Sequence, residues 1–434
     1  MSELDRRRFL AHTAKTCFGV SLGSSMATLF SPQASAAART AAKVAGGGKA
    51  KHIIYLFMNG GMSHIDTFDP KPAAEERIMG ATSAISTNVD GIQFGHYLPE
   101  LAKQADKLAL IRSMNTTQGA HEQGKYFMRT GYAQRASIVH PTAGAWVNRL
   151  SEPLNDTLPP FVTVNCGNGH PGAGFLSSEY QPLPIGDPSK GLQFSKRPKH
   201  TSAAAFDKQR EIQQMLDREF DERFHGGHKL VRSYGEVYNS AVKLMESKDL
   251  EAFDISKESE ATKKLYGGSK FAKGCLLAKR LVEKGVRSVE VEYGGFDWHL
   301  DNFGKAEEML PILDRALSAL LIDLEANGLL DSTLVVLATE FGRTPRVSND
   351  GGRDHYPKAF TTLMAGGGIK GGFCYGSTDE TASNVTSTPV NAGDFNATIG
   401  HAMGLDFERV IQSDSKRPFR MASRKGQVIS DLFA

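Results

Sequence analysis

Histidine and carboxylate side chains lie close to the ends of several apolar segments of this sequence, and these are residue types that bind divalent metal ions. Asp297 and His299 stand two positions apart shortly after one apolar run, and Glu340 directly follows another. A carboxylate and an imidazole in one loop can both face the same ion. Asp354 and His355 precede a further apolar run. The absence of cysteine from this set favours a catalytic zinc, manganese, iron or calcium ion over a structural zinc knot, although each histidine alone is equally compatible with a structural role.

The segment 59–72 is the densest polar cluster of the chain. Its paired glycines allow the backbone to approach a ligand closely, and Asn59, His64 and Asp66 are candidate metal ligands or supports for other ligands. The alternative interpretation is that Asp66 only turns the chain ahead of the prolines that follow it. Both interpretations stay open.

Several side chains are candidates for binding or neutralising an anion. His121 and Lys125 open a predicted helix, whose free N–H groups and dipole favour a negative charge. Arg353 has the planar guanidinium that grips a tetrahedral oxyanion with two hydrogen bonds. Arg343 could neutralise charge that develops during a reaction, but it could also simply pair with Glu340.

These side chains can act together only if the fold brings them to one place. Continuous apolar runs bounded by glycines are typical of strands that are buried on both faces of a parallel sheet. Their alternation with amphipathic stretches predicts an α/β protein, a three-layer α/β/α sandwich with a mostly parallel sheet. Right-handed crossovers then place the carboxyl ends of the strands at one edge, where such sheets hold ligands. The predicted strands are 53–58, 108–111, 286–291, 333–339 and 360–365, and the predicted helices include 209–220, 271–284 and 310–324.

Charge excludes one class of partner. The chain of 434 residues has 51 Lys and Arg against 48 Asp and Glu, a formal net charge of +3. This balance lacks the basic surplus of nucleic-acid binding proteins, so we expect no nucleic-acid partner.

The first 36 residues have the pattern of an export signal. Arg6, Arg7 and Arg8 precede a short apolar stretch, and a small-x-small exit ends at Ala36. The arginines followed by Phe-Leu are typical of a twin-arginine signal, which predicts transport of the folded protein by the twin-arginine translocase to the periplasm or the exterior. The alternative is a basic amphipathic helix at a membrane surface. No later segment is apolar enough for a stable membrane span.

The rest of the chain divides into a short linker and one large domain. Residues 37–50 are interpreted as the linker and 51–434 as the domain. Within the domain, 170–265 begins rich in proline and glycine and becomes charged and helical, so we expect a helical and loop insertion or a cap over the sheet edge.

Almost the whole predicted domain resembles family 1501 of the domains of unknown function, exported bacterial proteins placed in the alkaline-phosphatase-like superfamily. The resemblance is carried by Ile53–Pro72, Gly274–Val286, Glu340–Pro345 and Gly352–His355. It implies an alkaline-phosphatase-like fold with one or two metal ions at the carboxyl edge of the sheet.

The resemblance also indicates where this chain departs from the superfamily pattern. Asn59 stands where an aspartate ligand ends the first strand, and Phe341 stands where a histidine follows the acidic residue. His121 takes the position of the nucleophile and Lys125 that of the following arginine. An imidazole there could attack phosphorus, act as a base or bind metal, but it cannot become formylglycine, which disfavours ordinary sulfatase chemistry.

The leading hypothesis is an exported metallohydrolase acting on a small anionic phosphate or sulfate ester, for example a sulfated or phosphorylated saccharide. Its metal would be held by Asp297, His299 and His355, with Glu340 and Asn59 or Asp66 completing a second or shared site. The alternative is a binding or assembly protein that keeps the fold with a degenerate site. A surface polysaccharide binder is a third option, with little support from only two tryptophans.

Overall fold

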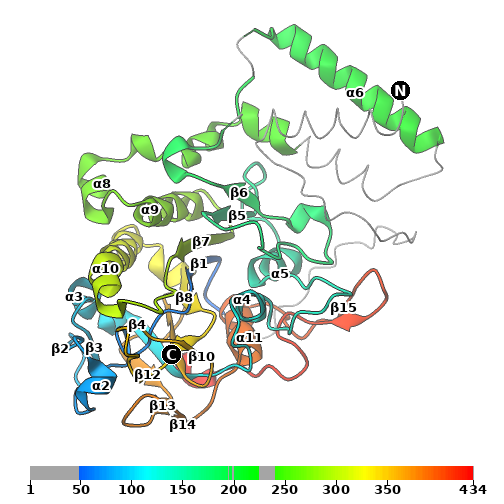
Figure 1. Cartoon of the computed structure of the whole chain (residues 1–434). Helices are drawn as coiled ribbons and strands as arrows, with labels where there is room; N and C mark the ends of the chain where they lie inside the picture. The colour runs from blue at the N-terminus through cyan, green and yellow to red at the C-terminus, as the bar shows by residue number, and fades with distance from the viewer. Residues whose placement is uncertain (1–47, 194, 198–199, 224–239, 434) are drawn as a thin grey trace.

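The computed structural model describes residues 48–433, apart from 194, 198–199 and 224–239 (Figure 1). The predicted export signal at 1–36 and the linker as far as residue 47 lie outside the described residues. None of the helices in the described ranges combines the length and the apolar character that a membrane span requires.

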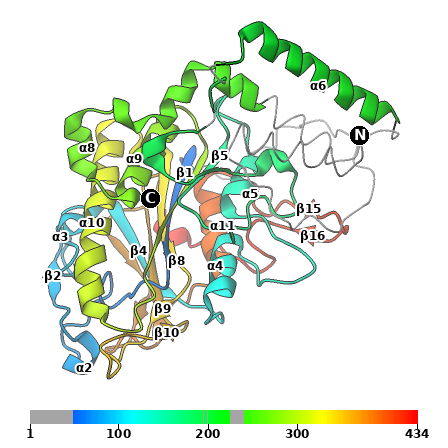
Figure 2. The same cartoon turned by 45° about the horizontal axis from the view of Figure 1, so that its top comes forward.

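An eight-stranded sheet forms the centre of the molecule, in the order β12-β4-β11-β8-β1-β7-β5-β6. Neighbouring strands pair in parallel everywhere except at β11, which is antiparallel to both β4 and β8. Helices cover both faces, so the predicted three-layer α/β/α architecture with a mostly parallel sheet is confirmed (Figures 1 and 2). The strands are β1 (His52–Asn59), β4 (Leu108–Met114), β5 (Phe161–Val164), β6 (Leu183–Ile185), β7 (Ser288–Gly294), β8 (Thr333–Thr339), β11 (Phe360–Ala365) and β12 (Phe373–Tyr375).

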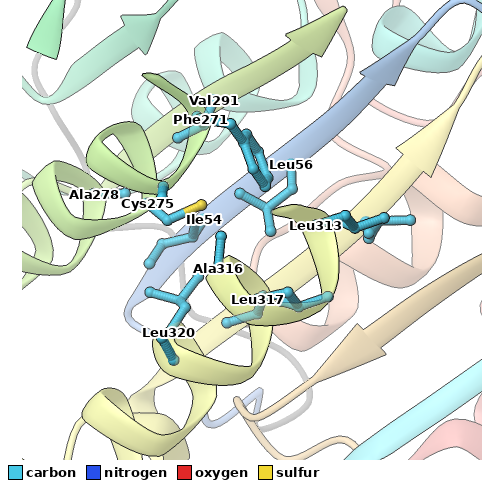
Figure 3. Packing of buried hydrophobic residues seen from close by; sticks show 14 of the residues in the cluster. Ile54, Leu56, Phe271, Cys275, Ala278, Val291, Leu313, Ala316, Leu317 and Leu320 are labelled. Atoms are coloured by element: carbon cyan, nitrogen blue, oxygen red, sulfur yellow. The ribbon is translucent and has the colours of Figure 1, made fainter. Parts of the chain in front are cut away.

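Strand β1 shows how the apolar runs make the core. Its side chains alternate between two hydrophobic clusters, because successive residues of a strand point to opposite faces of the sheet. Ile54 and Leu56 face the helices α9 (Lys270–Glu283) and α10 (Asn302–Ala326), and they belong to one buried cluster with Cys275 of α9 and Leu317 of α10 (Figure 3). Both faces of β1 are therefore shielded from solvent, which explains its unbroken apolar sequence.

The opposite face of the sheet is covered by three further helices. These are α4 (His121–Thr130), α5 (Ala143–Leu150) and α11 (Ala392–Ala402). They pack against the β1 side chains that α9 and α10 do not touch. Because α4 begins with His121, this layer places an imidazole at the edge where β1, β7 and β8 end.

The reversed direction of β11 differs from the simplest expectation for the fifth predicted strand. Its start, rather than its end, lies at the same edge as the ends of β1 and β8. His355 precedes β11 in the sequence and lies in β10 (His355–Tyr356), which pairs with β9 (Gly342–Arg343). Because β11 is reversed, His355, which precedes it, lies at the same edge as the residues that follow β7 and β8.

In its described residues, the segment 170–265 joins the main fold. It contributes β6 to the border of the main sheet, together with α8 (Glu260–Tyr266). Its longest helix, α6 (Ala203–Arg223), projects from the end of the molecule opposite to β9 and β10 (Figures 1 and 2). Other elements include α2 (Glu76–Met79), α3 (Pro99–Ala102), β2 (Ala84–Ser86), β3 (Gln93–Gly95), β13 (Ser377–Thr378), β14 (Val385–Ser387), β15 (Ile411–Gln412) and β16 (Pro418–Phe419).

Candidate metal centre

Side chains from four separate parts of the chain meet at one edge of the sheet. Asp297 and His299 lie in the loop after β7, and Glu340 directly follows β8. His355 comes from β10, and His121 is the first residue of α4. The predicted meeting of these residues is confirmed by the distances between them.

The loop after β7 points its polar side chains outward because its apolar ones are held in the core. Phe296 and Trp298 are buried, and the Trp298 indole donates a hydrogen bond to the carbonyl of Gly295 at 2.6 Å. Asp297 and His299 alternate with them, and their side chains are 45% and 43% exposed. The sequence Phe-Asp-Trp-His therefore fixes which residues reach the site.

Each of the three imidazoles has its Nδ1 hydrogen bonded to an acceptor. His355 Nδ1 donates to the carbonyl oxygen of Gly119 at 2.9 Å. His299 Nδ1 lies 2.8 Å from Asp354 Oδ1, and His121 Nδ1 lies 2.8 Å from Glu340 Oε1. A carbonyl or carboxylate oxygen can only accept here, so Nδ1 carries the hydrogen in all three rings.

The three Nε2 atoms consequently direct lone pairs towards the carboxylate of Asp297. His299 Nε2 and His355 Nε2 lie 3.0 and 3.2 Å from Asp297 Oδ1, and 3.1 Å from each other. His121 Nε2 lies 3.2 Å from Asp297 Oδ2, yet it is buried and has no hydrogen-bond partner. Lone pairs facing a carboxylate repel it unless a cation lies between them. The donor set therefore fits a divalent ion, with the Nδ1 bonds orienting its ligands as in known metal sites.

The pKa of Asp297 is shifted in the direction that keeps its side chain negatively charged. Burial raises the pKa of Asp297, but the hydrogen bond and charge of Arg343 outweigh it and lower the pKa overall. The hydrogen bond to Glu340 raises the pKa of His121 against the opposing effect of burial. Asp297 is therefore held as an anion, ready to bind a cation.

Three glycines make this close packing possible. Gly60 and Gly61 have φ of +123° and +77°, and a Cβ at Gly60 would lie 2.6 Å from the backbone nitrogen of Asp297. Gly124 lies in α4, where a Cβ would come within 3.0 Å of the Glu340 side chain. The helix that carries His121 can thus lie directly against Glu340.

Three predicted site residues lie away from this centre in a buried network of their own. Asp66 accepts hydrogen bonds from Arg353 Nε at 2.9 Å, and both side chains are fully buried. Burial raises the pKa of Asp66, but the charge and hydrogen bond of Arg353 lower it overall. His64 is also buried, its Nε2 lies 2.9 Å from the carbonyl of Ala382, and burial lowers its pKa. The structure brings neither Asp66 nor His64 to the imidazole cluster, and Arg353 faces Asp66 rather than an open site.

Two other predicted residues are near the centre but turned elsewhere. Asn59 donates from Nδ2 to Glu292 Oε1 at 2.9 Å, while its carbonyl accepts from the loop that carries Asp297. Lys125 lies one turn along α4 from His121 and pairs with Glu122 at 2.6 Å. The structure shows no contact of the Asn59 amide or the Lys125 amine with the imidazoles among the described residues.

A second cluster of metal-binding residue types was missed in the sequence. Cys166, His170 and Glu290 lie within 4.8 Å of one another. Glu290 and Glu292 interrupt β7 with acidic side chains, a signal that could have been noticed. Arg129 donates to Glu290 at 2.7 Å and to Glu292 at 2.6 Å.

This second cluster is a closed ion-pair network. The Gly172 backbone donates to His170 Nδ1 at 3.1 Å, so His170 Nε2 carries the hydrogen that it shares with Glu290 at 2.9 Å. Burial raises the pKa of the Cys166 thiol well above its ordinary value, which keeps the sulfur neutral. Arg129 already supplies the cation, so neither the ring nitrogen nor the sulfur is ready to bind a metal ion.

Replacing Glu290 tests this network. Burial raises the pKa of Glu290, but Arg129 and His170 outweigh it and lower the pKa from 4.5 to about 2. The stabilisation is therefore present above pH 4.5 and lost as the pH falls towards 2. Glu290→Gln is expected to lower the free energy of unfolding at pH 7 by about 3 kcal/mol, measured by denaturant titration.

The difference between Glu290→Gln and the unchanged protein should shrink as the pH falls from 4.5 towards 2, because in this window the carboxylate is protonated in the unfolded chain and still ionised in the native protein. Glu325→Gln is the control, because Glu325 is 57% exposed and pairs with Lys107 at 3.3 Å. It should change stability by less than about 0.5 kcal/mol. Equal stability of the two variants at pH 7 would contradict the proposed network.

Comparison with known proteins gives one family match and several distant structural ones. A family model described as "Protein of unknown function (DUF1501)" matches residues 50–433. No curated protein matches the chain in sequence.

Several solved enzyme structures resemble the chain in structure, but their sequence identity to it is low. A sulfatase from Pseudoalteromonas sp. is 12% identical with a TM-score of 0.38, covering 88% of this chain and 74% of that one. Alkaline phosphatase from the Antarctic bacterium TAB5 is 8% identical with a TM-score of 0.33, covering 83% and 99%. A phosphonate monoester hydrolase from Silicibacter pomeroyi is 10% identical with a TM-score of 0.32, covering 82% and 74%.

Proposed function

The chain belongs to the family described as proteins of unknown function (DUF1501), matched over residues 50–433, and from that premise we propose an exported, metal-dependent hydrolase. Its substrate would be a small phosphate or sulfate ester, including phosphorylated or sulfated saccharides. The observation that carries the proposal is the convergence of three imidazole Nε2 atoms on Asp297, with every Nδ1 already bonded.

The residues fit distinct roles around one ion. Catalytic zinc sites keep three protein ligands and an open position, and Asp297, His299 and His355 supply such a set. A bound divalent ion would polarise the ester oxygen and lower the pKa of water. Asp354 holds the ring of His299 through Nδ1 at 2.8 Å. These contacts orient the ligands before any substrate arrives.

His121 is suited to act as the base or nucleophile. Its Nε2 approaches Asp297 from the oxygen that His299 and His355 do not face. Glu340 is fully buried, accepts from the Gly60 backbone at 2.8 Å, and fixes the His121 ring through Nδ1. A carboxylate behind an imidazole in this way sets its tautomer and stabilises its positive form.

A catalytically inactive binding or assembly protein on the same fold is the second candidate. Phe341 forms an apolar wall, with its ring centre 5.1 Å from that of His121 and 4.7 Å from that of His355. Lys125 is paired with Glu122, and Arg343 and Arg353 are buried, so none of these three candidate cations is free to bind an ester anion. Anion binding would then depend on the metal ion alone.

Metal analysis and an ester assay separate these functions. Purified protein lacking residues 1–36 is assayed for retained divalent ions, then for hydrolysis of p-nitrophenyl phosphate and p-nitrophenyl sulfate with zinc, manganese or calcium. Retained metal with metal-dependent cleavage supports the hydrolase. Retained metal without cleavage of either ester favours the binding protein. No retained metal and no stimulation by any of the three ions would contradict the hydrolase.

We infer export to the periplasm or the exterior from the arginines at the N-terminus, because such pairs direct the twin-arginine route. Replacing Arg6, Arg7 and Arg8 by lysine should keep the protein in the cytoplasm, because the positive charge alone is not the signal that the translocase reads. Cell fractionation with immunodetection measures this, with Lys15→Arg as a matched control that should still be exported. Unchanged export of the triple variant would contradict the twin-arginine assignment.

A further inference from the structure

The number of metal ions that the centre holds depends on what lies between its carboxylates. His121 connects them, with Nδ1 at Glu340 and Nε2 towards Asp297. Paired metal ions in hydrolases lie about 3.5–4 Å apart and need oxygen ligands on both sides. Beside Asp297, the carbonyl oxygens of Gly60 and Gly61 would offer such ligands to a second ion.

Arg343 already uses those oxygens. Its Nη2 donates to Asp297 Oδ1 at 2.5 Å and also to the carbonyl of Gly60. Its Nε donates to the carbonyl of Gly61 at 2.8 Å. Its Nη1 donates to the carbonyl of Arg353 at 3.0 Å and approaches His299 Nε2 at 3.5 Å. The N–H donors of the guanidinium are thus engaged within the protein, and Arg343 is fully buried.

The guanidinium also changes the charge that metal ions must neutralise. With neutral imidazoles, the carboxylates of Asp297, Glu340 and Asp354 and the single positive charge of Arg343 leave two net negative charges, which one divalent ion neutralises. A second divalent ion at the carbonyls of Gly60 and Gly61 would have to displace the Arg343 N–H groups that already donate to these oxygens, and it would lie against a fixed positive charge that repels it. Because Arg343 is buried behind Asp297, it does not reach a substrate and acts as a positioning residue.

We infer that Arg343 is a built-in cation that occupies the place of a second metal ion, so that the centre binds one divalent ion and not two. This inference rests on the proposed metal centre. It predicts a ligand set of two imidazoles and one carboxylate for the single ion, with Arg343 holding Asp297 in position. Such a donor set suits zinc or manganese.

The stoichiometry of metal binding tests the inference on the unchanged protein. Metal-free protein is titrated with zinc against a chromophoric chelator, and bound zinc is measured after gel filtration. Asp297→Asn is titrated in parallel, so that ions bound elsewhere are subtracted. One ion per chain supports the inference, and two ions per chain overturn it. Zero ions per chain would instead contradict the proposed function itself, so the two failures are distinguishable.

Two variants of Arg343 then test the cause. Arg343→Met removes the charge with a side chain of similar length, and it should admit a second ion at raised zinc concentration. Arg343→Lys keeps a positive charge and should remain at one ion. A single ion in a folded Arg343→Met protein would contradict the assigned role. If Arg343→Met does not fold, the electron paramagnetic resonance spectrum of the manganese-loaded unchanged protein still decides the number of ions, because two neighbouring ions give an exchange-coupled spectrum, which would overturn the inference, and one ion does not.

Discussion

Asp297→Asn is expected to reduce ester hydrolysis by about 10³-fold or more, because a bound metal ion contributes several kcal/mol to the transition state and each 1.4 kcal/mol is a factor of ten in rate. Within the part of the chain that the structure describes, Asp297 is the only carboxylate that faces all three Nε2 atoms. An amide keeps the shape, but it removes the negative charge and can point an N–H group at the ion. The dissociation constant for zinc and kcat/KM, measured on the same sample, check the result.

The control and a graded variant define what would contradict this prediction. Asp350→Asn changes an exposed aspartate in the loop before His355 and should leave both quantities unchanged. Asp354→Asn should weaken metal binding by about 10-fold to 100-fold, because Asp354 only orients His299. Zinc affinity of Asp297→Asn equal to that of Asp350→Asn would show that the ion is held elsewhere.

His121→Ala is expected to lower turnover by about 10²-fold to 10⁴-fold while the metal ion is retained. The reason is that His299 and His355 face one oxygen of Asp297, whereas His121 faces the other. The variant therefore removes the base or nucleophile but leaves the ligand set intact. Metal content and kcat, determined together, separate these effects.

His96→Ala serves as the matched histidine control. His96 Nδ1 accepts a hydrogen bond from the Ser83 backbone at 3.1 Å and lies outside the centre. Turnover should be unaffected by this change. Loss of the metal ion from His121→Ala would make His121 a ligand, and unchanged turnover would remove it from the catalytic machinery.

Most of the fold was predictable because a strand that is buried on both faces has a continuous apolar sequence. The apolar runs at 53–58 and 333–339 coincide with β1 and β8, and the helix expected at 271–284 coincides with α9. The direction of β11 was not predictable, because an apolar run has the same pattern whichever way it crosses the sheet. Strand β6 was missed because its three residues, one of them proline, are too short for a periodic signal.

The candidate centre was predictable to the extent that its residues follow strands. Asp297, His299 and Glu340 come shortly after β7 and β8, and the topology of a parallel sheet brings such positions together. His355 was found only as a metal-binding residue type before a strand. His355 lies at the centre because β11 is reversed, so that the start of this strand lies at the edge where β8 ends.

The remaining assignments depended on side-chain directions that the sequence does not contain. Asp66 and Arg353 are far apart in the sequence, and their ion pair at 2.9 Å is visible only in the structure. Both residue types suit an active site as well as a buried pair, so their chemistry alone could not separate the two roles. The pairing of Arg129 with Glu290 was missed for the same reason.

Anomalous diffraction from a crystal soaked in zinc tests the central claim most directly. The proposed centre predicts a single strong peak at about 2.0–2.2 Å from the Nε2 atoms of His299 and His355 and from a carboxylate oxygen of Asp297. His121 Nε2 should face the same ion across its open position. A soaked crystal with no peak among these side chains, or with the peak at Cys166 and His170 instead, would contradict the account.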